Sequence, residues 1–91
     1  MRLEREGSAG ERTHMIKKRV HFENMLEVAD FVKISSGFPD EIKLIGDDYE
    51  ADAKSMLGIF GMDISKPLCV LIHGSAAGER KVCAAMKQYF A

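Results

Sequence analysis

The sequence predicts an α+β domain: a four-stranded, mostly antiparallel sheet with three helices on one face, in the order β-α-β-β-α-β-α. Three observations lead to this prediction. Alternation of apolar and polar residues over 15–22 changes to an apolar period of about four over 25–32. Two short apolar segments flank the turn sequence Gly46-Asp47-Asp48. A continuous apolar run at 68–72 then precedes a second stretch of helical periodicity.

The first strand and helix are indicated by the apolar residues that repeat on one face. The predicted core positions are Ile16, Val20 and Phe22 in the strand, and Met25, Val28, Ala29 and Val32 in the helix. Asn24 is the expected N-cap, because its side-chain oxygen can accept a free backbone N–H. Gly37 and Pro39 are expected to end this helix.

The second half of the chain is expected to hold a hairpin, a short helix, a central strand and a final helix. The expected elements are a strand through Ile42 and Leu44, its return at 49–51, a helix over 53–57 capped by Asp52, a strand at 68–72 and a last helix capped by Ser75. The apolar stripe predicted for the last helix is Val82, Ala85, Met86 and Tyr89.

Composition and charge exclude several classes of function. The 91 residues are 46% hydrophobic and 30% charged, which is typical of one globular domain with one core. The formal net charge is -1, so no overall field draws the chain to nucleic acid or to an anionic membrane. No apolar run approaches the ~20 residues of a membrane span. We therefore expect neither a nucleic-acid nor a membrane partner.

The first 14 residues are charged, contain Gly and Ser, and show no periodicity. We expect a flexible leader at 1–14, with Met15 as an alternative natural start, and one domain at 15–91. No signal-peptide pattern is present, so the cytoplasm is the expected location. Cys69 and Cys83 lie in apolar stretches and are expected to be buried free thiols. Their spacing is not a metal motif, and we expect no metal and no cofactor.

Three stretches carry a resemblance to a known family. They are Phe31-Val32-Lys33 followed by Ser36-Gly37-Phe38, then Asp52 to Gly58 with its Ala53-Lys54-Ser55 core, and Ile72-His73-Gly74. In this order and spacing the chain resembles HPr, the histidine-containing phosphocarrier of the bacterial sugar phosphotransferase system, from about Val20 to Phe90. The resemblance implies an HPr-like open-faced β-sandwich.

The family's active-site stretch, Gly-Leu-His-x-Arg-Pro-Ala, is absent at the matching position. In an ungapped alignment, Asn24 stands where the family has histidine, Leu26 where it has arginine, and Glu27 where it has proline. An amide is no nucleophile for phosphorus, and Leu26 cannot pair with phosphoryl oxygens. Glu23 and Glu27 place negative charge near the site, at roughly a kcal/mol each against a phosphoryl group. The resemblance thus implies a divergent member with no catalytic histidine.

Three other histidines, His14, His21 and His73, are expected to be ordinary leader, surface or strand-end residues. An active phosphocarrier that uses one of them remains the alternative hypothesis. A further alternative is that the fold serves as an unrelated small binding domain.

Ser55 matches the serine that HPr-like proteins of Gram-positive bacteria present to a regulatory kinase, so the resemblance implies phosphorylation there. In the family, the residues around this helix form the docking surface for partner proteins. The corresponding positions in this chain are Lys54, Met56, Leu57, Ile59 and Phe60. We expect a monomeric, non-enzymatic module whose partner is a phosphotransferase-system enzyme, a serine kinase or a transcription regulator.

Overall fold

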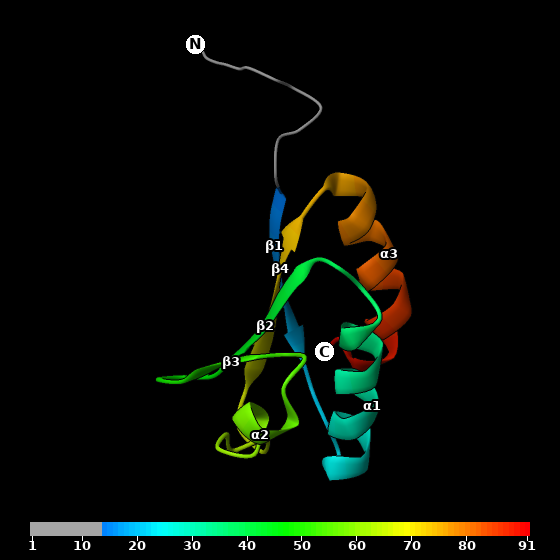
Figure 1. Cartoon of the computed structure of the whole chain (residues 1–91). Helices are drawn as coiled ribbons and strands as arrows, with labels where there is room; N and C mark the ends of the chain where they lie inside the picture. The colour runs from blue at the N-terminus through cyan, green and yellow to red at the C-terminus, as the bar shows by residue number, and fades with distance from the viewer. Residues whose placement is uncertain (1–13) are drawn as a thin grey trace.

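A single antiparallel sheet organises the protein, with its strands in the order β1-β4-β2-β3. The computed structural model describes residues 14–91. The strands are β1 (His14–Val20), β2 (Glu41–Ile45), β3 (Glu50–Asp52) and β4 (Leu68–Gly74), and the helices are α1 (Met25–Ser36), α2 (Met56–Ile59), α3 (Ala76–Met86) and a 3-10 turn at Lys87–Tyr89. Figure 1 shows α3 above α1 along one face of the sheet, with α2 at the lower end of the molecule. The predicted fold class and element order are confirmed.

The N-terminal boundary differs slightly from the prediction, because β1 begins at His14 and not at Met15. The rest of the predicted leader, residues 1–13, lies outside the described residues. The central strand is confirmed and runs two residues further than predicted, to Gly74. Its alternate residues Leu68, Val70 and Ile72 are buried, as a strand with neighbours on both sides and helices on one face requires.

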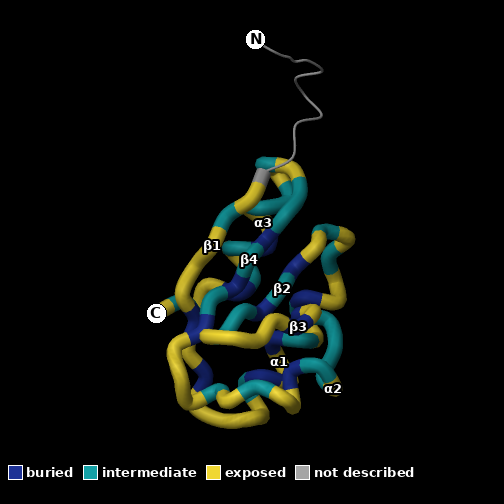
Figure 2. The backbone as a smooth tube through the Cα atoms, turned by 90° about the vertical axis from the view of Figure 1, so that its left-hand side faces the viewer, coloured by how far each residue is buried: buried dark blue, intermediate teal, exposed yellow. Residues whose placement is uncertain are grey.

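The buried face of α1 is rotated from the predicted one. Val28, Phe31 and Ser35 are buried, whereas Met25 and Ala29 are exposed. The cause is an aromatic cluster: the Phe31 ring lies 5.1 Å from that of Phe22, edge to face, and 6.1 Å from that of Tyr89. A large ring at position 31 therefore sets which side of α1 turns to the core, shown dark blue in Figure 2.

The start of α2 also differs from the prediction. Asp52 is the last residue of β3, and its carboxylate accepts the Lys54 N–H at 2.9 Å. The chain stays extended one residue longer, because the Ala53 N–H donates to the Ile42 carbonyl at 2.9 Å. The helix is then a single turn, and Ser55, not Asp52, is its N-cap.

The predicted start of α3 is confirmed. The backbone of this region packs closely against the side chain of Asp40. Ser75 Oγ accepts the Gly78 N–H at 2.9 Å. A methyl group added at Gly74 or at Gly78 would collide with the Asp40 carboxylate. Both positions therefore need glycine while Asp40 holds this place.

The two cysteines are free but only half-buried, so the prediction of buried thiols is wrong in degree. They lie where apolar strand and helix residues meet the surface, Cys69 on β4 and Cys83 on α3. Burial raises the pKa of the Cys83 thiol. Over the described residues, no helix is long and apolar enough to cross a membrane.

Candidate functional site

The first turn of α1 is closed by its own residues. Asn24 Oδ1 accepts the Glu27 N–H at 3.1 Å, which confirms the predicted N-cap. Glu27 Oε1 in turn accepts the Glu23 N–H at 2.8 Å. This reciprocal arrangement is a variant of the capping box. Two of the N–H groups at this end are satisfied by oxygens that the chain itself supplies.

The charge next to this end is negative. His21 Nε2 lies 3.0 Å from Glu23 Oε2, and both side chains are exposed. The Nε2 atom of His21 is thus paired with a carboxylate, and Glu27 adds a second carboxylate. Carboxylates stabilise a helix start through the macrodipole, but they repel an incoming anion.

The start of α2 has similar cap geometry with different chemistry. Ser55 Oγ, half-buried, accepts the Gly58 N–H at 3.1 Å. The neighbouring Lys54 does not extend into solvent, because its Nζ donates to the Phe38 carbonyl at 2.6 Å. Tyr49 Oη donates to the Gly58 carbonyl at 3.1 Å and closes the other end of the turn. The α2 turn is therefore linked by hydrogen bonds to the residue before β3 and to the chain after α1.

Of the predicted docking residues, the structure exposes two fully. Leu57 is 82% exposed and Phe60 61%, and Met56 is half-buried against the core. Ile59 is fully buried, so it is a core residue and its predicted contact with a partner is corrected. A helix of four residues is held in place mainly by packing against the core, and Ile59 is the α2 residue that is buried there.

Leu26 is a third strongly exposed apolar residue. In the sequence it was notable only as the residue at the family's arginine position. It is 81% exposed in the first turn of α1. Figures 1 and 2 both place α2 and the start of α1 at the same end of the molecule. We call Leu26, Leu57 and Phe60 the apolar end surface. One feature of the sequence could have revealed the exposure of Leu26: it is an apolar residue outside the predicted buried stripe of the helix.

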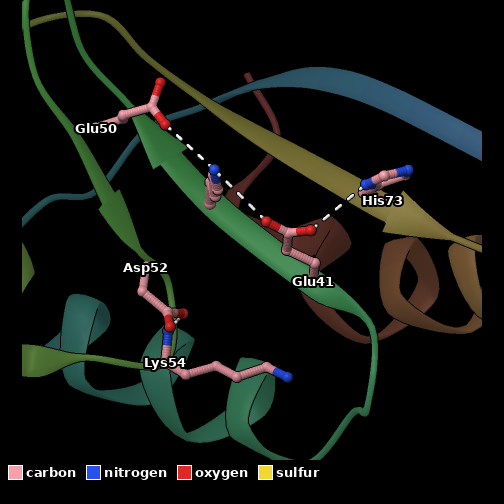
Figure 3. Close-up of polar contacts among 6 residues, drawn as sticks. Glu41, Glu50, Asp52, Lys54 and His73 are labelled. Atoms are coloured by element: carbon pink, nitrogen blue, oxygen red, sulfur yellow. Dashed lines mark hydrogen bonds and ion pairs between the residues drawn. The ribbon is translucent and has the colours of Figure 1, made fainter.

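The remaining histidines lie apart from the start of α1. His73 is on β4, where its Nδ1 is 3.4 Å from Glu41 Oε1 (Figure 3). His14 begins β1. Across residues 14–91, no three His, Cys, Asp or Glu side chains are arranged to hold a metal ion.

An open antiparallel sheet, helices in this order and a capped helix directly after β1 define a small α+β protein of the open-faced sandwich class. A family model described as "PTS HPr component phosphorylation site" matches residues 25–91. The chain therefore belongs to the HPr family of the phosphotransferase system. The match begins one residue after Asn24.

Solved structures of similar fold include three of this family. The phosphocarrier HPr of Bacillus anthracis is 22% identical, covers 85% of this chain and 98% of its own, and has a TM-score of 0.64. The histidine-containing phosphocarrier of Mycoplasma is 17% identical over 82% and 89%, with a TM-score of 0.62. HPr-C-His of Thermoanaerobacter tengcongensis is 23% identical over 85% and 88%, with a TM-score of 0.58. At these identities they support the fold alone. No curated protein sequence matches this chain.

Proposed function

We propose that this HPr-family protein is a non-enzymatic regulatory module that works through protein contacts and carries no phosphoryl group at the start of α1. One observation carries the proposal: the position that caps α1 is an asparagine, locked by Glu27 and bordered by Glu23. A phosphoryl carrier needs a neutral imidazole nitrogen beside free N–H groups. Here the nucleophile is absent and two carboxylates occupy the surroundings.

The first alternative is phosphoryl transfer to another histidine, and His21 is its best candidate because it is exposed beside α1. Its nearest partner is the Glu23 carboxylate, at 3.0 Å. A phosphoryl group on that nitrogen would break the pair and meet two negative charges. A positively charged fork would favour the transfer, but the side chain at the family's arginine position is Leu26.

The regulatory part of the proposal rests on Ser55. Its oxygen caps α2, so a phosphoryl group there would add negative charge at the end of a helix turn that bears free N–H groups. Leu57 lies two residues on and is 82% exposed. Modification at Ser55 would therefore change the charge beside an apolar surface.

The apolar end surface is the proposed partner site. Three large exposed apolar side chains at one end of a small domain are typical of an interaction surface. The partner is a phosphotransferase-system enzyme, a serine kinase or a transcription regulator, and the protein acts in the cytoplasm with 15–91 as its working domain. Nucleic acid and membrane are not proposed as partners.

Intact mass after two incubations tests the proposal. With phosphoenolpyruvate and the general phosphotransferase enzyme, we expect no acid-labile phosphoryl addition. An addition that disappears in His21→Ala would overturn the non-carrier proposal in favour of His21.

With the serine kinase and ATP, we expect one acid-stable addition that is lost in Ser55→Ala. Ser65→Ala is the matched control, because Ser65 is a nearby exposed serine whose hydroxyl is bound to Asp63. Loss of the addition in Ser65→Ala, or no addition to the wild type, would remove Ser55 regulation from the proposal.

A further inference from the structure

The face of the sheet turned away from α1 and α3 carries no helix in the described part of the chain (Figure 1). Residues directly opposite on paired strands point to the same face, so the strand register orders the outward side chains into rows. The three rows are Met15, His73 and Glu41; Lys17, Leu71, Lys43 and Asp52; and Arg19, Cys69, Ile45 and Glu50. We call these residues the open face.

Charge on the open face is separated by strand. Lys17 and Arg19 lie on the edge strand β1, whereas Glu50 and Asp52 lie on the opposite edge strand β3. Among the ion pairs of the described residues, none joins these two edges. One edge is therefore basic and the other acidic.

The cation between the edges is neutralised locally. Lys43 Nζ lies 3.4 Å from Glu50 Oε1 and 3.5 Å from Glu41 Oε2. The hydrogen bond and charge of Glu50, and then the charge of Glu41, raise the pKa of Lys43. His73 also approaches Glu41 (Figure 3). Two carboxylates, Glu50 and Glu41, thus share Lys43. Asp52 adds a further negative charge on β3, so the β2–β3 side of the face stays negative.

The centre of the open face holds three apolar residues beside the ion-paired Lys43. Leu71 and Cys69 on β4 and Ile45 on β2 are each half-buried by their neighbours within the sheet. A second layer placed on this face would remove their remaining apolar surface from water. Apolar residues between two oppositely charged edges are the pattern of a desolvated centre with a polar rim.

We propose that the open face binds a second copy of this chain, with a two-fold axis parallel to the strands between β4 and β2. This rotation lays β1 of one copy over β3 of the other, and β4 over β2. An axis perpendicular to the strands would lay β1 on β1 and bring like charges together, so charge selects the first axis.

The register then matches the charges row by row. Arg19 shares its row with Glu50, so it faces Glu50 of the second copy, and Lys17 faces Asp52 in the same way. Sheets pack about 10 Å apart and at about 30°, a gap that an arginine and a glutamate side chain span together. Cys69 lies over Ile45 of the second copy, Leu71 over the aliphatic stem of Lys43, and His73 over Glu41.

The area predicts a weak association. The strands β1, β4, β2 and β3 have 7, 7, 5 and 3 residues. At about 3.3 Å per residue and about 4.8 Å per strand, they give a footprint of roughly 350 Å² per copy. A standard interface buries about 800 Å² per partner, so the dimer forms at high protein concentration and weakens with salt. It uses none of the apolar end surface, and the monomer expected from the sequence is the competing outcome.

Sedimentation velocity of the full chain over a wide concentration range tests the proposal with a charge swap. We expect the wild type to move from the mass of one chain toward that of two. Arg19→Glu and Glu50→Arg each place like charges opposite one another, and each should weaken self-association about tenfold or more. An equimolar mixture of the two variants, and the double variant Arg19→Glu/Glu50→Arg, should restore it.

Arg80→Glu is the matched control, because it makes the same charge change on an exposed residue of α3, in the helical layer. Circular dichroism of each variant checks the fold, and the folded double variant keeps the test valid if Glu50→Arg alone unfolds. A wild type that stays monomeric at millimolar concentration would overturn the proposal. So would a dimer indifferent to Arg19→Glu, or a variant mixture that fails to associate.

Discussion

The starts of α1 and α2 are built alike and are chemically opposite. In each, a side-chain oxygen accepts the N–H three residues on at 3.1 Å, from Asn24 in α1 and from Ser55 in α2. The α1 cap is an amide between two glutamates. The α2 cap is a hydroxyl that follows a lysine. Cap geometry therefore says nothing of reactivity, which depends on the capping atom and on the charges beside it.

Restoring chemistry to α1 is the largest change that we predict. Asn24→His alone should show no acid-labile phosphorylation by phosphoenolpyruvate and the general enzyme, because Glu23, Leu26 and Glu27 are unchanged. Asn24→His/Leu26→Arg/Glu27→Pro should accept the group, since the fork returns and one carboxylate leaves. Intact mass before and after acid measures both. Full phosphorylation of the single variant would show that the carboxylates are no barrier.

Within and next to α2, replacing the buried residue should lower the free energy of unfolding by several kcal/mol more than replacing an exposed one. Ile59→Ala removes a fully buried side chain and should lower the free energy of unfolding by about 2–5 kcal/mol. Leu57→Ala and Phe60→Ala should each change it by about 0.5 kcal/mol or less, because both side chains are exposed. Urea unfolding measures all three. A large loss in Leu57→Ala would place that side chain in the core and remove it from the partner surface.

The two caps should differ modestly in stability. Asn24→Ala should cost about 1–2 kcal/mol, because it opens a twelve-residue helix, and Ser55→Ala about 1 kcal/mol or less, because α2 is one turn. Ser55→Asp should stay close to wild type, since aspartate is an equally good cap. Chemical denaturation measures the series. An equal loss in Ser55→Asp and Ser55→Ala would mean that the hydroxyl does more than cap.

The smallest predicted change in stability concerns the hydrogen bond between Tyr89 and Asp30 in the middle of α1. Burial, and then the hydrogen bond that Tyr89 Oη donates to Asp30, raise the pKa of Tyr89. A raised folded-state pKa means that this stabilisation is complete below the ordinary pKa of about 10 and is lost as pH rises through the folded value. Tyr89→Phe should cost about 1 kcal/mol at pH 7. The gap to wild type should narrow above about pH 10, and pH-dependent urea unfolding measures it.

Local signals predicted the element order, both long-helix caps and the central strand, because these depend on neighbours in the sequence. The face of α1 was misjudged because Phe31 meets Phe22 and Tyr89, which no helical spacing reveals. The prediction of Asp52 as the cap of α2 is wrong because Ala53 still pairs with Ile42 on the neighbouring strand. Such a long-range hydrogen bond leaves no local signal in the sequence. The sequence alone shows that residue 24 is an asparagine and therefore offers no imidazole nucleophile. The exposure of Leu26, Leu57 and Phe60 and the burial of Ile59 could be known only from the fold.

The Asp40 carboxylate sits where a side chain at Gly74 or Gly78 would begin. Asp40 is thus sterically coupled to two glycines near the start of α3 that lie more than thirty residues away in the sequence. In a lineage that keeps Asp40, neither glycine can drift to alanine without forcing the aspartate to turn away. A smaller side chain at position 40 would remove the steric conflict with a methyl group at Gly74 or Gly78. We therefore expect Gly74→Ala to be tolerated better in an Asp40→Ser background than in the wild type.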